Sequence, residues 1–482
     1  MEGSLTLDAT ISVIVPIFNV APYLPACLSS IARQSHQALQ VVMIDDGSTD
    51  DSATIAGRFA ARDDRFTLLQ QHNQGLGAAR NAGLLHATGE FLAFVDSDDL
   101  LAQDALAVMV ATLHESGSDF AAGVVRRFDA RGSHRSSITP YGRSKLGTHV
   151  TVSPKLLRDR LVTNKLWRRS FWDRLKLRFD EGVLYEDVWV ARKAHIEAGA
   201  VDVLGDTVYW WRLRGAGETS ITKNRAVAKG VIDRVDVAHR VAELLSQKGL
   251  HDLKRRYDLA ALARELKMFV DVADQGDREY RGALRDSIGG FVRSVEDGVL
   301  EDLRAIDRLK YHLLERGLLD ELLHVLAFER TQLRASGAVG KGEELYGDYP
   351  YLDDPELAVP RGVYRLRSEL RVNAAIRVLR WRDGRLELRG HAYVQHVDAP
   401  TPDALRTRLL VRDVRAGTQV SVPVRQQHRP GVTVRSGQLA HCYDGAAFTA
   451  TLDVQQLLSD AGESELQIGV EVEANGVRRT TQ

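Results

Sequence analysis

Cysteine is nearly absent from this chain, which has only Cys27 and Cys442 in 482 residues. Two distant cysteines cannot build a disulfide framework or a cysteine-based zinc site, so we expect a reducing compartment. No apolar run approaches the roughly 18 residues that a membrane-spanning helix needs, and residues 1–10 lack the apolar core of a signal peptide. These absences predict a cytoplasmic protein that meets a membrane only peripherally, through a partner or a substrate.

The chain also has almost no net charge. Its 64 lysines and arginines stand against 65 aspartates and glutamates, which gives a formal net charge of -1. A balanced chain has no overall field that would hold nucleic acid or an anionic membrane. We therefore expect no nucleic-acid partner, and any polyanionic ligand must meet a local basic patch.

Residues 10–225 alternate apolar runs of strand length with amphipathic segments. Strands are expected at 11–18, 40–44, 66–70 and 91–95, and helices at 23–34, 50–61 and 76–86. This alternation predicts an α/β domain with a Rossmann-like, mostly parallel sheet that is covered by helices. Polar motifs follow the strands directly, at the edge where open α/β sheets bind their ligands.

The remaining chain has two other patterns. Residues 226–345 contain long amphipathic stretches, at 227–248, 251–271 and 302–336, and predict a helical domain. Residues 346–360 are rich in proline, tyrosine and acidic residues and are expected to form a linker.

Residues 361–482 change to an alternating, strand-like period. Seven short strands are expected, at 363–370, 375–381, 386–394, 407–411, 419–424, 448–454 and 466–472. Such a series predicts a C-terminal β-sandwich. The chain stops at Gln482 shortly after the last of them, as a piece of a longer protein would.

The strongest chemical signal is the acidic run Asp96-Ser97-Asp98-Asp99, at the end of an apolar strand. Carboxylates grouped at a strand end repel one another unless a cation neutralises them, and hard oxygen ligands suit Mg²⁺ or Mn²⁺. Such an ion also neutralises a diphosphate. The structural alternative is that Asp98 or Asp99 caps the helix expected after it.

Three further polar motifs follow the other strands. They are Pro16-Ile17-Phe18-Asn19, Asp45-Asp46-Gly47-Ser48-Thr49-Asp50, and the segment from Asn73 through Arg80 to Gly83. In this order and spacing, and followed by Asp96 to Asp99, they resemble the catalytic domain of glycosyltransferase family 2, which has the GT-A fold. The resemblance covers about residues 11–221.

The resemblance implies a role for each matching residue on the donor side. Pro16 and Asn19 would line the pocket of a uridine-type base, and Asp46 would accept a hydrogen bond from that base. Asn73 and Arg80 would approach the donor nucleotide and its phosphates, because a guanidinium fork suits phosphate oxygens. The structural alternatives are an Asx turn at Asp46 and a helix-surface salt bridge at Arg80.

The resemblance also assigns the metal and the base. Asp96 would contact the donor ribose or the metal, and Asp98 would ligate a Mn²⁺ or Mg²⁺ cofactor. Asp187 would be the general base that takes the proton of the acceptor hydroxyl, with Glu186 positioning it or binding acceptor. The alternative is that Glu186 and Asp187 only favour the N-terminus of a helix.

Three more residues are candidates for donor binding. Lys165 would pair with an acid or with a donor phosphate, and the structural alternative is an ordinary surface lysine. Arg212 and Ser220 lie in a segment, 209–222, which in related enzymes closes over the diphosphate. That segment has no histidine, although some family members place a metal-ligating histidine there.

These residues predict an inverting, metal-dependent glycosyltransferase. It would move a sugar from a nucleotide-diphosphate donor, in particular a UDP-sugar, to a hydroxyl of a polyol-phosphate or glycan acceptor. A polyol-phosphate transferase on the same fold and a catalytically silent carbohydrate-binding protein are the alternatives.

The order of the three domains loosely resembles bacterial transferases that glycosylate wall teichoic acid or related surface polymers. That likeness implies a cell-wall polymer as acceptor and a homo-oligomer, such as a trimer, assembled through the C-terminal domain. The start of this domain is basic, which suits a polyanionic acceptor or an ordinary solvated sheet face. Its arginines are Arg361, Arg365, Arg367, Arg371, Arg377, Arg380 and Arg382.

Overall fold

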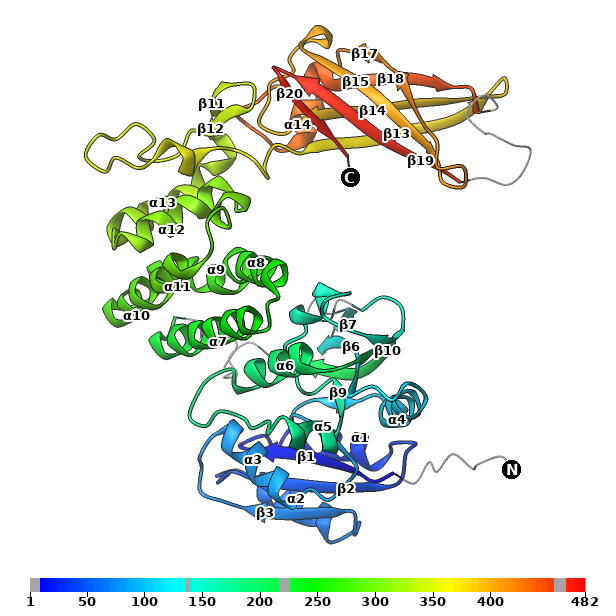
Figure 1. The fold of residues 1–482 in the computed structure, drawn as a ribbon, viewed down its shortest axis with the longest axis vertical. Coiled ribbons are helices and arrows are strands. Elements are labelled where there is room, and N and C mark those ends of the chain that lie inside the picture. The colour runs from blue at the N-terminus through cyan, green and yellow to red at the C-terminus, as the bar shows by residue number, and fades with distance from the viewer. Residues whose placement is uncertain are drawn as a thin grey trace. The chain divides into compact units, whose positions relative to one another are not determined.

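A computed structural model describes residues 9–129, 131–135, 139, 141–215, 226–454 and 465–481. The chain divides into two compact units, Met1–Asp258 and Leu259–Gln482. Figure 1 shows the α/β elements of the first unit and the helices and antiparallel sheets of the second.

The first unit is built on a ten-stranded sheet whose first four strands are parallel neighbours in the order β3-β2-β1-β4. Strands and helices alternate here as predicted. The elements are β1 (Ile11–Ile17), α1 (Leu24–Ala32), β2 (Leu39–Asp45), α2 (Ser52–Ala60), β3 (Phe66–Gln70), α3 (Leu76–His86) and β4 (Phe91–Phe94).

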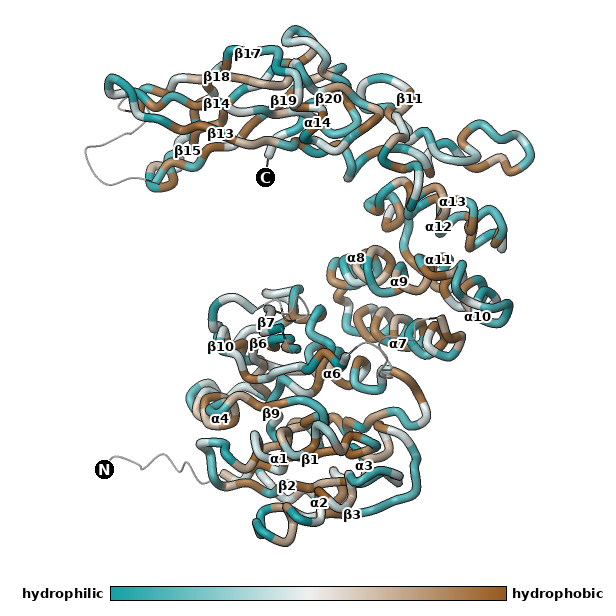
Figure 2. Tube along the Cα trace, turned by 180° about the vertical axis from the view of Figure 1, so that it is seen from behind, coloured by the Kyte–Doolittle hydropathy of each residue, from teal (hydrophilic) through white to brown (hydrophobic). Residues whose placement is uncertain are grey.

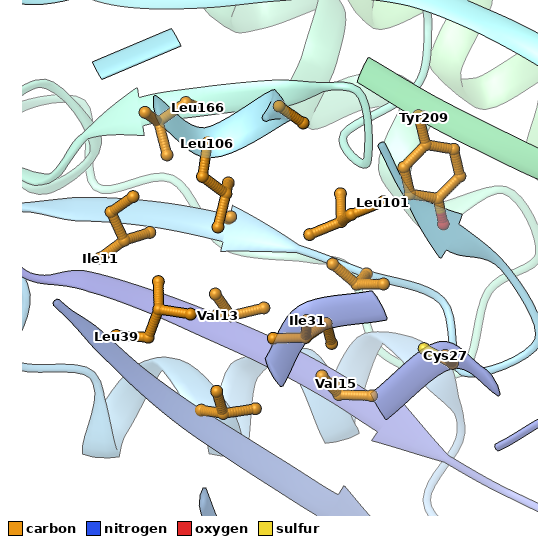
Figure 3. Packing of buried hydrophobic residues seen from close by; sticks show 14 of the residues in the cluster. Ile11, Val13, Val15, Cys27, Ile31, Leu39, Leu101, Leu106, Leu166 and Tyr209 are labelled. Atoms are coloured by element: carbon orange, nitrogen blue, oxygen red, sulfur yellow. The ribbon is translucent and has the colours of Figure 1, made fainter. Parts of the chain in front are cut away.

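Strand β1 forms the centre of this core, and all seven of its residues are buried. Figure 3 shows Val13 and Val15 of β1 packed with Cys27 and Ile31 of α1. On α3, a Cβ added at Gly83 would lie 2.5 Å from a methyl carbon of Ile14. Glycine at this position therefore lets α3 lie directly on β1.

The second half of the sheet is mixed. β9 (Lys165–Arg168) runs antiparallel between β4 and β6 (Phe120–Asp129), and β10 (Val201–Arg212) pairs in parallel with β6. The short strand β5 (Leu100–Leu101) closes the order antiparallel to β10. The prediction of a mostly parallel α/β sheet is confirmed.

Helices α4 (Ala105–Ser116), α5 (Arg169–Arg174) and α6 (Glu186–Glu197) complete the sheet's cover. The first unit also includes α7 (Ala228–Gln247), which the sequence analysis assigned to the helical domain. Val237, Val241 and Leu245 of α7 join one apolar cluster with residues of α6. This packing attaches α7 to the α/β core.

Helices also dominate the chain up to about residue 335, as predicted. They are α8 (His251–Ala260), α9 (Lys267–Val270), α10 (Arg278–Ala283), α11 (Gly289–Ser294), α12 (Ala305–Glu315) and α13 (Leu319–Thr331). Figure 2 shows hydrophilic and hydrophobic positions interleaved along these helices, as amphipathic stretches require. Within the long amphipathic stretch at 302–336, Gly317 is expected to end a helix, and its φ of +73° does end α12 there.

The segment predicted as a linker, 346–360, packs on these helices. It follows the hairpin of β11 (Ala338–Lys341) and β12 (Glu344–Gly347). Tyr349 is only 7% exposed, and its ring lies 5.9 Å from that of Phe328 on α13. The large buried ring fixes the segment to the second unit.

Two four-stranded antiparallel sheets form the C-terminal part, with strand orders β13-β14-β18-β17 and β16-β15-β19-β20. Their strands are β13 (Val372–Arg382), β14 (Arg385–Val394), β15 (Leu405–Asp413), β16 (Gln419–Pro423), β17 (Arg425–Gln427), β18 (Ala447–Leu452), β19 (Leu466–Ala474) and β20 (Val477–Thr480). The predicted β-sandwich is thus confirmed as a β-rich region. The strand expected at 363–370 does not form, because a 3₁₀ turn at Arg361–Tyr364 buries the Tyr364 ring instead.

Across the part of the chain that the structure describes, no helix is long and apolar enough to cross a lipid bilayer.

Candidate active site

The acidic run after β4 forms a turn that β10 holds in place. The Asp96 N–H donates to the Tyr209 hydroxyl at 3.1 Å, and Asp99 accepts from the Arg212 N–H at 2.7 Å. Asp99 is buried, and its burial together with the charges of Asp98 and Asp96 holds its pKa well above the usual range. The Asp99 carboxylate therefore has a structural role, because it stabilises the turn.

The capping alternative does not apply to this turn. Helix α4 begins at Ala105, and the residue at its N-cap is Asp104. Neither Asp98 nor Asp99 stands at that position, so both carboxylates belong to the strand-end turn.

Arg80 of α3 joins the acidic turn to the start of α6. Its Nη2 lies 2.6 Å from Asp96 Oδ1, and its Nη1 bonds the Glu186 carboxylate. The guanidinium is 2% exposed and lies over the Phe179 ring, 5.2 Å from its centroid. Burial by itself would lower the pKa of Arg80, but the charges of Asp96, Glu186 and Asp187 raise it. Arg80 therefore forms a buried version of the salt bridge that was its structural alternative, and its contact with donor phosphates stays a prediction.

The two acids of the second cluster lie in the first turn of α6. Tyr185, directly before them, has a left-handed φ of 64°, which turns the chain sharply into the helix. Burial raises the pKa of Asp187, and the nearby Arg80 opposes this shift. Among the described residues none donates a hydrogen bond to the Asp187 carboxylate. Asp187 is therefore an unengaged carboxylate with a raised pKa, which is what a general base needs.

Glu186 differs from Asp187 because its carboxylate forms a salt bridge with Arg80. Burial raises the pKa of Glu186, while Arg80 opposes the shift. A fixed ion pair suits a positioning residue better than a proton acceptor.

The candidate base-binding residues meet at the carboxyl ends of β1, β2 and β3. Asp46 is 3% exposed, and its two oxygens accept from the side chain of Gln71 at 2.7 Å and from the N–H groups of Gln74 and Gly75 at 2.9 and 2.8 Å. These partners are distant in sequence, so Asp46 clamps the loop after β3 and does not form an Asx turn. Its contact with a nucleotide base stays a prediction.

Asn19 and Asn73 border this clamp. The Asn19 amide oxygen accepts from the Thr49 N–H at 2.8 Å, which ties the first motif to the second. Asn73 is exposed, and its backbone nitrogen would lie 3.0 Å from a Cβ added at Gly47. Pro16 is buried within β1. The first three motifs therefore form one continuous edge of the sheet.

Two arginines from the end of β10 approach the acidic turn. Arg212 Nε donates to the Asp98 backbone carbonyl at 2.7 Å, and Arg214 bonds the Asp98 carboxylate at 2.8 Å. Sequence reasoning named Arg212 and missed Arg214. The available signal was its position two residues after Arg212, just past the end of β10, since residues two apart in extended chain lie on the same side.

Two donor-binding candidates remain, Lys165 and Ser220. Lys165 is fully buried in an ion pair with Asp159 at 2.8 Å, so it has the acidic one of its two predicted partners and is not a surface lysine. Burial lowers the pKa of Lys165, and Asp159 opposes this. Ser220 lies outside the described residues.

Asp96 and Asp98 suit a divalent cation that arrives with its substrate. In the described part of the chain, no group of three or more His, Cys, Asp or Glu side chains is placed to hold a metal by itself. Burial and the charge of Asp96 raise the pKa of Asp98, and a bound cation would relieve this repulsion. Mg²⁺ commonly uses one or two carboxylates together with substrate phosphates, so these two acids fit such an ion.

Comparison with known proteins agrees with this geometry. Residues 12–175 match the family model for glycosyl transferase family 2. This segment is a family 2 glycosyltransferase domain. The matched range contains β1 to β9 and every candidate donor-side residue up to Lys165.

Several bacterial proteins are similar to this domain. Glycosyltransferase GlyA of Streptococcus pneumoniae is 34% identical over 220 residues, which cover 44% of this chain and 31% of that protein. The putative glycosyltransferase EpsH of Bacillus subtilis is 32% identical over 211 residues, covering 42% of this chain and 60% of that one. Poly(ribitol-phosphate) beta-N-acetylglucosaminyltransferase TarS of Staphylococcus aureus is 29% identical over 211 residues, or 43% of this chain and 36% of TarS. The similarity thus spans less than two thirds of each relative.

Solved structures extend the likeness in fold. Residues 1–349 of S. aureus TarS in complex with UDP-GlcNAc superpose with a TM-score of 0.58 at 23% identity, covering 71% of this chain and 97% of that one. The longer TarS structure gives 0.59 at 17% identity and covers 98% of this chain and 77% of that one. At such identities the likeness establishes the shared fold.

Proposed function

We propose that this protein is an inverting glycosyltransferase that moves a sugar from a UDP-sugar to a hydroxyl of a polyol-phosphate polymer of the cell wall. The observation that carries the proposal is the pair of salt bridges that Arg80 forms, one with Asp96 and one with Glu186. Through these two contacts, one guanidinium holds the acids at the end of β4 close to the acids at the start of α6. A single reaction centre needs both sets of acids close together.

The chain's own residues support each step of the reaction. Asp187, with a carboxylate left unengaged by the described residues, takes the proton of the acceptor hydroxyl as that oxygen attacks the anomeric carbon. Attack from the side opposite the diphosphate breaks the sugar–phosphate bond and inverts the anomeric centre. Glu186, held by Arg80, positions α6 and its neighbour.

A Mn²⁺ or Mg²⁺ ion held by Asp96 and Asp98 would supply a Lewis acid that neutralises the departing diphosphate. Arg212 and Ser220 are our candidates for further contacts to that diphosphate. Arg214 shields the Asp98 charge at 2.8 Å, which keeps the acidic turn stable while no ion is present.

On the donor side, Asp46 and Asn19 are our candidates for recognising the base, with Pro16 and Asn73 bordering it. The choice of uridine is supported by the TarS complex with UDP-GlcNAc, which shares this fold. The choice of a polyol-phosphate acceptor is supported by the name of TarS, a poly(ribitol-phosphate) beta-N-acetylglucosaminyltransferase. We expect the reaction on the cytoplasmic side, with peripheral contact to a membrane-linked acceptor.

A donor panel tests the proposed function. The melting temperature is measured with UDP-, GDP- and dTDP-sugars, each with and without Mn²⁺, because a ligand that binds only the folded state raises it. We expect the largest rise with a UDP-sugar plus Mn²⁺, and release of UDP when a polyol-phosphate acceptor is added. A rise without any release of UDP would favour the catalytically silent alternative.

We also propose that the C-terminal sheets assemble the protein as a homo-oligomer. β13 is an edge strand, and it carries exposed apolar side chains at Leu379 and Trp381, which are 58% and 66% exposed. An exposed edge strand with large apolar side chains is a surface that proteins usually cover.

A further inference from the structure

Strands β13, β14 and β18 of the sheet β13-β14-β18-β17 border a strongly basic pocket. It spans about 350 Å³, part of which is open to solvent. Four arginines and a histidine contribute the polar lining: Arg377, Arg389, His391, Arg429 and Arg435. Val378, Val432 and Phe448 give it an apolar floor.

These four arginines have no acidic partner among the residues that the structure describes. Elsewhere in the second unit, arginines such as Arg330 and Arg479 pair with carboxylates at 2.6 and 2.7 Å. Burial lowers the pKa of His391, and the charges of Arg377 and Arg435 lower it further. The pocket therefore has a positive potential that the described residues do not neutralise.

The backbone geometry of β13 and β14 places Arg377 and Arg389 at the pocket. The pairing of β13 with β14 is interrupted between Ile376 and Val378, so Arg377 occupies a β-bulge, a feature that redirects a side chain. After the bulge Val378 lies opposite Arg389 on β14. A Cβ added at Gly390 would meet the Ala375 carbonyl at 2.4 Å, so glycine permits the close approach of the two strands.

The other wall is the short helix α14 (Val432–Ser436), which brings Arg435 to the pocket. Asp444 Oδ1 accepts from the N–H groups of Gly431 and Thr433 at 3.1 and 3.2 Å, which pins the helix. The neighbouring Tyr443 ring stacks on Tyr393 of β14 at 3.9 Å. The Asp444 carboxylate is thus occupied by backbone N–H groups, and the segment that contains α14 is held against the sheet.

We propose that this pocket binds the phosphate groups of a phosphate-ester chain. Guanidinium forks match phosphate oxygens, and four of them without acidic partners suit a ligand with repeated negative charge. The apolar floor suits the carbon skeleton between phosphates. A polyol-phosphate polymer has this chemistry, so the pocket holds a stretch of the acceptor; this last step rests on the proposed function.

Binding to the whole protein, without a donor, tests the pocket independently of transfer. The probes are inorganic phosphate, a short poly(glycerol phosphate) and an oligonucleotide of equal charge, each titrated calorimetrically. The pocket variant is Arg389→Ser with Arg435→Ser. The matched control is Arg380→Ser with Arg412→Ser, which removes the same charge from exposed arginines outside the pocket.

We expect the pocket variant to bind poly(glycerol phosphate) about tenfold or more weakly, since each charged hydrogen bond contributes substantially. The control should change by less than about threefold, because it removes only general charge. Equal weakening in both variants, or no weakening in the pocket variant, would overturn the site. Pocket-dependent binding that is tighter for the oligonucleotide would overturn the choice of ligand.

Turnover separates this inference from the proposed function. Neither pair of arginines contributes to the reaction centre, so both variants should transfer sugar to a small, uncharged acceptor at the unaltered rate. Loss of transfer to the polymer alone, in the pocket variant alone, is the expected result. If the unaltered protein transfers no sugar yet binds poly(glycerol phosphate) through these arginines, the pocket stands and the proposed function fails.

Discussion

Arg80 and Glu186 lie 106 residues apart in the sequence and form an ion pair whose side chains are 2% and 6% exposed. The pair connects α3 with the first turn of α6, and the second nitrogen of Arg80 extends the connection to Asp96. Three segments of the first unit therefore depend on one guanidinium. Breaking a buried pair by removing one partner leaves an uncompensated charge, which is strongly destabilising.

Arg80→Met should therefore lower the free energy of unfolding by about 3–5 kcal/mol, because Glu186 and Asp96 lose their cation. Arg80→Lys should retain part of this stability but reach only one carboxylate, so that kcat falls even where the fold survives. Chemical denaturation and steady-state kinetics measure the two effects. Arg178→Met, at a side chain 74% exposed, is the control. Wild-type kcat in Arg80→Lys would show that the double contact is dispensable.

Asp187→Asn should abolish transfer and leave donor affinity nearly unchanged. The amide keeps the size of the side chain but cannot accept the proton, and loss of general-base catalysis costs about 10²- to 10⁴-fold in rate. Product formation and the UDP-sugar thermal shift are measured on the same sample. Asp173→Asn, at an aspartate 63% exposed on α5, should leave both quantities unaltered. Normal turnover in Asp187→Asn would assign the base to another residue.

The pH dependence of kcat/KM should report the same carboxyl. Burial raises the pKa of Asp187, and a base must be ionised to act, so activity is lost as the pH falls through this raised value. We expect the acidic limb clearly above about 3.9, the value of an ordinary aspartate. A flat profile down to about pH 4 would contradict this. The sign for stability is opposite: because the folded state holds the proton more tightly, this group's contribution to the free energy of unfolding decreases as the pH rises through that window.

Asp98→Ala should weaken donor binding only where the metal contributes. In the unaltered protein we expect the UDP-sugar to raise the melting temperature more with Mn²⁺ than with EDTA, since the ion bridges protein and diphosphate. In the variant this difference should shrink, and the contact of Arg214 with the Asp98 carboxylate at 2.8 Å is lost. Asp104→Ala, at the start of α4, is the control because that side chain makes no capping hydrogen bond. An unchanged Mn²⁺ effect would remove Asp98 from the metal site.

The sequence was sufficient for the features that depend on local pattern. The alternation of apolar and amphipathic runs predicted β1 to β4 with α1 to α3, and the rule that ligands meet strand ends predicted that Asn19, Asp46 and Asp96 share an edge. The family motifs then predicted the GT-A fold, which the periodicity of apolar residues alone does not identify.

Local sequence patterns did not predict the ion pairs between residues that are distant in the chain. Nothing in the local sequence tells whether an arginine such as Arg80 faces a phosphate or two carboxylates, because Glu186 arrives from a different helix. Lys165 is a similar example, since its fully buried position opposite Asp159 follows from the packing of β9. The assignment of α7 to the first unit likewise depends on which apolar face it meets.

The assembly of the C-terminal sheets is testable through the exposed face of β13. Leu379→Glu with Trp381→Glu places charge on side chains that are 58% and 66% exposed. These residues are largely solvent-accessible in a single chain, so the double variant should fold normally. If β13 forms the contact between subunits, burying two carboxylates there is prohibitive and light scattering should give the mass of one chain. Leu439→Glu, at a position 77% exposed elsewhere in the same unit, should leave the assembled mass unaltered. An oligomer that survives the double variant would move the interface away from β13, while a monomeric unaltered protein would overturn the assembly itself.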